Sequence, residues 1–80
     1  MDKGSVQNNI RTLRFNHEEM TQQQLADKVG VSRQTIVAIE KGHYSPSLEL
    51  AFRIARVFET PLEQVFSFEP GPEKPKRKTG

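Results

Sequence analysis

The fold of this chain is decided by residues 21–42, which read TQQQLADKVGVSRQTIVAIEKG. Thr21 followed by Gln24 has the spacing of a capping box, so a helix is expected to begin here. Gly30 can adopt the left-handed conformation that ends a helix, and Ser32 is a favoured cap for the next one. Apolar residues recur between these signals at the spacing of an inner helix face: Leu25, Ala26, Val29, Ile36 and Ile39. The stretch therefore predicts two short helices joined by a tight turn.

The two predicted helices must cross closely, and the sequence provides for that. Ala26 is small and lies where a larger side chain would push the helices apart. Polar side chains begin the second helix, while its apolar residues face the core. This layout is that of a helix-turn-helix motif, whose second helix can lie in the major groove of DNA.

Helical spacing of apolar residues also predicts helices on both sides of this motif. These further helices are expected at about residues 6–17, 47–58 and 60–66. Ser47 is the expected cap of the fourth helix. Thr60 is the expected cap of the fifth, with Pro61 in its first turn and Glu63 completing a capping box. Since no stretch alternates between apolar and polar residues as a strand does, the predicted fold class is all-α with five helices.

The composition changes after Phe68. Residues 69–80 read EPGPEKPKRKTG and offer no apolar side chain to bury. We therefore expect a disordered basic tail at residues 69–80, following one helical domain at residues 1–68.

The charge distribution limits how the chain could bind nucleic acid. Its formal net charge is +2. Residues 1–68 hold eight Lys and Arg side chains and eight Asp and Glu side chains, so the positive excess lies in the tail. A protein held to DNA by charge alone needs a strongly basic core. Binding by this chain would rest on a local basic face and specific contacts, in more than one copy.

Several classes of function lack their characteristic residues in this sequence. It has no pairing of a nucleophile with a base and no Gly-rich phosphate loop, so we expect neither an enzyme nor a bound cofactor. Since no Cys accompanies His17 and His43, we expect no metal site. We find neither a secretory signal nor an apolar run of membrane-spanning length. We expect a soluble cytoplasmic protein without membrane attachment and without a small-molecule effector.

Residues 20–42 and their continuation resemble the Cro/cI family of helix-turn-helix proteins, the xenobiotic-response-element (XRE) type. The continuation reads YSPSLELAFRIARVF at residues 44–58 and PLEQVF at residues 61–66. The likeness covers about residues 6–68, and it implies a five-helix, lambda-repressor-like DNA-binding domain. It also implies a prokaryotic transcriptional repressor that reads a palindromic operator as a homodimer and is associated with the nucleoid when bound.

The resemblance further implies which side chains meet DNA. Base contacts are expected from Arg33, Gln34 and Val37, since Arg suits guanine, Gln suits adenine and Val can touch a thymine methyl. Phosphate or backbone contacts are expected from Gln22, Ser32, Thr35, Lys41, His43, Tyr44 and Ser45. Judged by residue type alone, each polar side chain could also be plain solvated surface.

The family pattern adds a structural expectation and shows two departures. Arg14 and Glu40 are expected to form an ion pair that orients the motif, while Gly30 makes its turn. The link at residues 15–19 is about one residue longer than is usual in the family. Glu59 stands where Gly is common after the fourth helix.

The sequence leaves two questions open. The candidates for a dimer face are Val57, Val65, Phe66 and Phe68, but the aromatic residues could instead close the core of a single subunit. The alternative function is an antitoxin-like module that binds a partner protein and whose DNA binding is autoregulatory. Its candidate partner-binding segment is the short tail, which lacks apolar anchors.

Overall fold

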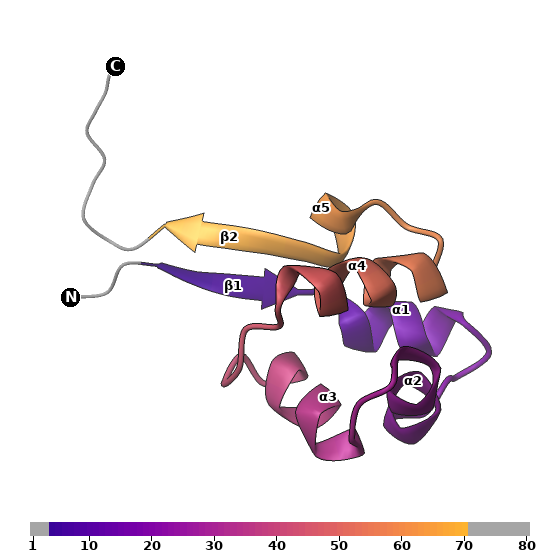
Figure 1. The fold of residues 1–80 in the computed structure, drawn as a ribbon. Helices are drawn as coiled ribbons and strands as arrows, with labels where there is room; N and C mark the ends of the chain where they lie inside the picture. The colour runs from indigo at the N-terminus through magenta and orange to yellow at the C-terminus, as the bar shows by residue number, and fades with distance from the viewer. Residues whose placement is uncertain (1–3, 71–80) are drawn as a thin grey trace.

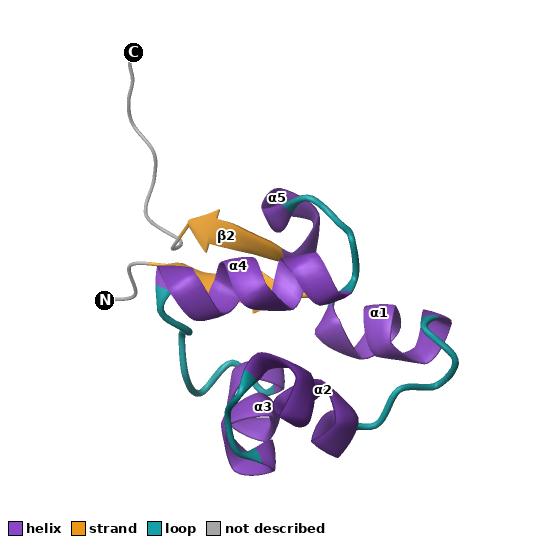
Figure 2. Ribbon diagram, turned by 45° about the vertical axis from the view of Figure 1, so that its right-hand side comes forward, coloured by secondary structure: helices purple, strands orange, loops and turns teal. Residues whose placement is uncertain are grey.

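A computed structural model describes residues 4–70 of the chain (Figure 1). These residues form five helices and two strands in the order β1 (Gly4–Asn8), α1 (Ile10–Asn16), α2 (Gln22–Val29), α3 (Arg33–Glu40), α4 (Leu48–Val57), α5 (Leu62–Val65) and β2 (Phe66–Pro70). The expected five-helix domain is confirmed. Figure 1 shows the two strands side by side, leading away from the helices, and in the turned view of Figure 2 helix α4 lies in front of them.

Helix α2 begins and ends at the predicted signals, and α3 begins at its predicted cap. The Thr21 side chain accepts from the backbone N–H of Gln24 at 3.0 Å, and the Gln24 side chain accepts from the N–H of Thr21 at 2.8 Å. Gly30 ends α2 with a φ of 82°. The Ser32 side chain then accepts from the N–H of Thr35 and caps α3. The turn between the helices is therefore fixed by local contacts of the motif itself.

One apolar core holds the five helices together. Each helix contributes a side chain with no exposed surface: Ile10, Leu25, Ile36, Ile54 and Val65. Burial of an aliphatic side chain of this size stabilises a fold by about 1.5–3 kcal/mol. Ala26 is also fully buried, as its expected place at the helix crossing requires.

The two-stranded sheet corrects the expectation that no strand would form. Strands β1 and β2 are antiparallel, with Val6 opposite Phe68. Val6 therefore lies in a strand, and the first helix begins only at Ile10. Phe66, predicted in the fifth helix, begins β2 instead. The pairing joins opposite ends of the domain, and periodicity within one short segment does not reveal such a partner.

Two Asn residues explain why α1 starts late. The Asn8 side chain accepts from the N–H of Ile10 at 3.1 Å and donates to the carbonyl of Ile39 at 3.0 Å. The backbone N–H of Asn9 donates to the carbonyl of Val65 at 2.9 Å. Because these bonds hold residues 8–9 against α3 and α5, the chain before Ile10 is drawn into the sheet rather than into the helix.

Strand β2 also moves the boundary expected between domain and tail. Glu69 pairs with Ser5, and Pro70 pairs with Gly4, so the predicted boundary after Phe68 falls inside a strand. The remainder of the expected tail, residues 71–80, lies outside the described residues.

The start of α5 differs from the prediction as well. The Thr60 hydroxyl donates to the carbonyl of Phe58 at 2.8 Å, and the Thr60 N–H donates to the carbonyl of Ala55. Thr60 therefore closes the end of α4. The residue that precedes α5 as its N-cap is Pro61, and no side chain caps the helix, so the capping box expected with Glu63 does not form.

The two departures from the family pattern are the longer link at residues 15–19 and the Glu at residue 59. In both places a Glu residue adopts the left-handed backbone conformation. In the link after α1, Glu18 has a φ of 56° and Glu19 a φ of 55°. After α4, Glu59 has a φ of 51°. This conformation costs a residue with a Cβ roughly 1–2 kcal/mol. The longer link and the missing Gly are therefore tolerated with some backbone strain.

Replacing Glu59 with Gly is expected to raise the free energy of unfolding by about 1 kcal/mol, because Gly has no Cβ to oppose the left-handed conformation. Urea denaturation measures the change. Glu63→Gly is the matched control, since Glu63 lies within α5 and Gly there should cost about 0.5–1 kcal/mol. If both variants lost stability equally, the strain assigned to Glu59 would be wrong.

Candidate nucleic-acid interface

The first turn of α3 presents free polar side chains. Arg33 and Gln34 are exposed, and Val37 is half-buried one turn later. Within residues 4–70, neither Arg33 nor Gln34 makes a side-chain hydrogen bond or ion pair. Figure 1 shows α3 and α2 along one side of the domain, away from α5. The expected base-contact residues therefore lie together on an open helix face.

The hydroxyls of Ser32 and Thr35 are already engaged with each other. Their oxygens are 3.1 Å apart, and the Ser32 oxygen also accepts from the N–H of Thr35. A hydroxyl has one donor and two acceptor positions, so both retain capacity for a further partner. Their first role in the fold is to start α3.

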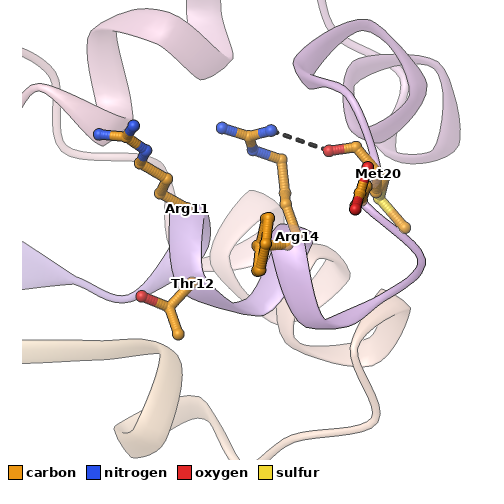
Figure 3. A pocket seen from close by; sticks show the side chains of 6 residues that line it. Arg11, Thr12, Arg14 and Met20 are labelled. Carbon is orange, nitrogen blue, oxygen red and sulfur yellow. Dashed lines mark hydrogen bonds between the residues drawn. The ribbon is translucent and has the colours of Figure 1, made fainter.

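A bidentate ion pair joins the first helix to the end of the third. The Arg14 Nε lies 2.7 Å from Glu40 Oε2, and Arg14 Nη2 lies 3.1 Å from Glu40 Oε1. Arg14 Nη1 also donates to the carbonyl of Met20 at 2.8 Å, as Figure 3 shows. The Arg14 and Glu40 side chains are only 14% and 9% exposed. The structural ion pair expected from the sequence is formed, and it also fixes the end of the link before α2.

Gln22 is connected to this ion pair. Its side-chain Nε2 donates to Glu40 Oε1 at 3.2 Å, and the residue is half-buried at the first position of α2. The bond uses one of the two hydrogens on the amide nitrogen, which leaves the other hydrogen and the amide oxygen available. The structure thus gives the expected phosphate ligand an intramolecular partner that holds it in place.

A surface cleft brings the ion pair together with two cations. It is lined by Arg11, Arg14, Thr21, Gln22, Val37, Glu40 and Lys41. Arg14 neutralises Glu40 here, while Arg11 and Lys41 are exposed and have no ion-pair partner among the described residues. The lining of the cleft therefore carries a net positive charge and suits an anion.

Arg11 is a candidate site residue that the sequence prediction missed. It lies three residues before Arg14, one turn earlier on α1, so both project from the same side of the helix. In Figure 3 the two guanidinium groups extend from α1 in the same direction. The i, i+3 spacing from the expected ion-pair residue was the signal that could have identified it.

The remaining expected phosphate contacts follow α3. Lys41 is the C-cap of that helix, and His43, Tyr44 and Ser45 form the exposed loop that leads to α4. Tyr44 keeps 49% of its surface exposed. These residues follow α3 directly in the chain, but the three loop residues do not line the cleft with Arg11.

The expected dimer face is wrong in one residue. Val65 is fully buried in the core and cannot meet a second subunit. Val57 and Phe66 are partly buried and pack against the same core, which supports the alternative that they close a single subunit. Phe68 is 62% exposed in β2.

Residues 4–70 contain no group of three His, Cys, Asp or Glu side chains that could hold a metal ion. None of the helices there is long and apolar enough to cross a membrane. His17 packs edge-on against Phe58, with ring centroids 5.2 Å apart.

Comparison with known proteins identifies relatives along most of the chain. A model of the helix-turn-helix family matches residues 10–65. An uncharacterised HTH-type transcriptional regulator of Methanocaldococcus jannaschii is 52% identical over 64 residues, which cover 80% of this chain and 96% of the relative. The regulator YgzD of Bacillus subtilis is 44% identical with the same coverage. RstR, a transcriptional repressor of the cryptic phage CTXphi in Vibrio cholerae, is 34% identical over 72% of this chain and 51% of RstR.

Two solved structures have the same fold. A candidate DNA-binding protein from Bacteroides fragilis superposes with a TM-score of 0.67 and 22% identity, over 78% of this chain and 98% of that protein. The transcriptional regulator VanUg superposes with a TM-score of 0.68 and 20% identity, over 89% of this chain and 93% of VanUg.

Arg14→Met is expected to lower the free energy of unfolding by about 3–5 kcal/mol, because it leaves Glu40 nearly buried and unpaired. Arg14→Met/Glu40→Met should recover most of this loss, since no unpaired charge remains. Arg53→Met is the control: it breaks the exposed Arg53–Glu49 pair and should cost less than about 1 kcal/mol. Chemical denaturation measures all three variants. Equal losses for Arg14→Met and Arg53→Met would contradict the role given to the buried pair.

Proposed function

The chain belongs to the helix-turn-helix family of Cro/cI type and is a DNA-binding transcriptional regulator, and we propose that it is a repressor that reads a palindromic operator as a homodimer. Helix α3 would lie in the major groove with its first turn toward the bases. The observation that carries the proposal is the exposed, unpartnered pair Arg33 and Gln34 on that turn, among the residues that the structure describes. The repressor role is supported by the 34% identity to RstR, which is itself a transcriptional repressor.

Sequence readout would come from three side chains. Arg33 can donate to guanine O6 and N7, and Gln34 can bond adenine N6 and N7. Val37, half-buried beside them, can touch a thymine methyl. Each good bidentate base contact is worth about 1–3 kcal/mol of discrimination, so two of them per subunit suffice for selective binding.

Phosphate contacts around α3 would fix the position of the protein along the DNA duplex. We propose that Arg11 and Lys41, which line the cleft, bind one stretch of DNA backbone together with Gln22. The exposed loop at residues 43–45 would meet the backbone beyond the end of α3. Such contacts fix the orientation of a protein on DNA, whereas the base contacts select the sequence.

We infer that the chain binds its operator as a dimer, because one domain can contact only a few base pairs. The first turn of α3 spans only a few base pairs, and residues 1–68 carry no net positive charge to add affinity. Two copies related by a two-fold axis would double every contact, on half-sites about one helical turn, 34–36 Å, apart.

Arg33→Ala and Gln34→Ala are each expected to weaken operator binding about 10- to 100-fold while leaving helicity unchanged, because each removes a base contact from an exposed side chain. Fluorescence anisotropy with an operator duplex and a scrambled duplex separates specific from non-specific binding. Arg53→Ala and Gln23→Ala, which change exposed residues outside the first turn of α3, are matched controls. An equal loss of affinity for both duplexes would show that these two side chains do not read bases.

A chain truncated after Pro70 is expected to bind DNA with weaker salt dependence and unchanged sequence preference. The truncation removes Lys74, Lys76, Arg77 and Lys78. For each of these side chains that binds a phosphate, its removal makes the slope of log K against log salt concentration shallower by about 0.9. Affinities at several salt concentrations measure the slope, and an altered preferred sequence would show that the tail reads bases.

A further inference from the structure

The aromatic ring of Phe15 is exposed to solvent beside the proposed DNA interface. Its side chain is 66% exposed, whereas α1 meets the core through the fully buried Ile10 and through Leu13. Phe15 follows Arg11 by four residues, so the two side chains lie one turn apart on the same face of α1. Packing within the domain therefore does not account for an aromatic side chain at this position.

A hollow in the surface adjoins Phe15. It is lined by Arg11, Thr12, Arg14, Phe15, Glu19 and Met20. Figure 3 shows Arg11, Thr12 and Arg14 on α1, with Met20 on the link that leads to α2. Arg11 and Arg14 also line the cleft that contains Gln22 and Lys41. The hollow and the cleft are therefore adjacent and share these two arginines.

The hollow differs from the cleft in its charge. Arg14 is neutralised by Glu40, so the charges that remain in the hollow are those of Arg11 and Glu19, which are opposite in sign. Glu19 is exposed, and its side chain has no hydrogen bond or ion pair among residues 4–70. A phosphate bound in the hollow would be repelled by this carboxylate. The hollow therefore suits an uncharged group with an apolar surface better than an anion.

We propose that Phe15 packs against a deoxyribose of the operator backbone, an inference that rests on the mode of DNA binding proposed above. Each DNA strand alternates anionic phosphates with uncharged deoxyribose rings, whose carbon atoms present an apolar surface. Because the cleft and the hollow share Arg11, a strand whose phosphate is bound by Arg11 would place the adjoining sugar against Phe15. This contact adds buried apolar area to the phosphate contacts and carries no sequence information.

Affinity measured at several salt concentrations distinguishes this contact from a charged one. Phe15→Ala is expected to weaken operator binding about 3- to 10-fold, because less apolar area is buried. The slope of log K against log salt concentration should keep its wild-type value, since no phosphate contact is lost. Arg11→Ala should instead make the slope shallower by about 0.9. Phe15→Leu keeps an apolar side chain and should recover most of the affinity that Phe15→Ala loses.

Leu48→Ala is the matched control for Phe15→Ala. Leu48 is 67% exposed on α4 and lines neither the hollow nor the cleft. Its truncation removes a similarly exposed apolar side chain and should leave operator affinity unchanged. Circular dichroism verifies that every variant is folded.

Hydroxyl-radical footprinting locates the contact on the DNA, because the radical removes hydrogen from exposed deoxyribose rings and so cuts the strand there. The wild-type chain should protect a sugar next to the phosphate that Arg11 binds. Phe15→Ala should lose this protection, and Leu48→Ala should keep it. Ethylation interference identifies the phosphate, since its ethylation should impair binding by the wild-type chain and have little further effect on Arg11→Ala.

The outcomes separate this inference from the function on which it rests. Wild-type affinity of Phe15→Ala, or unchanged sugar protection in its complex, would overturn the inference and leave the base contacts of Arg33 and Gln34 standing. A shallower salt slope for Phe15→Ala would also overturn it, because the ring would then act through the neighbouring cations. If the wild-type chain does not prefer its operator to a scrambled duplex, the proposed readout fails and this inference fails with it.

Discussion

The bidentate pair between Arg14 and Glu40 is the interaction on which the proposed DNA-reading surface depends. It ties α1 to the last residue of α3, and the same guanidinium holds the carbonyl of Met20 at the entry to α2. Gln22 is bonded to the same carboxylate. Because the desolvation cost of a buried ion pair offsets much of its attraction, its contribution is to geometry more than to net stability. The pair sets the angle at which α2 and α3 present their polar ends.

The proposed recognition rests on few groups, because residues 1–68 carry no excess of positive charge. Arg14 neutralises Glu40, and so Arg11 and Lys41 provide a local positive field at the cleft although residues 1–68 are neutral. Arg33 and Gln34 lie in the first turn of α3, and their side chains have no intramolecular partner among the described residues. A neutral domain binds non-specific DNA weakly, so in the proposed mode of binding a larger share of the affinity comes from base contacts and from pairing of two copies.

Local sequence signals are enough to predict the helix-turn-helix motif. The pairing of strands that are far apart in the chain cannot be predicted from such signals. The capping residues and Gly30 lie within a few residues of the structure they determine. Helix α2 begins and ends at these residues, and α3 begins at its predicted cap. The β1–β2 sheet depends on contacts between the two ends of the domain, so helical spacing alone predicts a helix at Val6, where a strand forms. The burial of Val65 is hidden for a related reason, since it depends on the packing of the other helices. The candidate DNA-contact residues remain predictions, but the structure adds Arg11 to them through a cleft that three helices build together.

A few side chains on α3, presented twice by a dimer, are therefore proposed to select the DNA sequence. Selection of bound duplexes from a random DNA pool by the full-length chain is the most direct test. We expect enrichment of a palindrome whose half-sites are about one helical turn apart. Enrichment of a single unrepeated half-site, or no enrichment over the starting pool, would contradict the proposal.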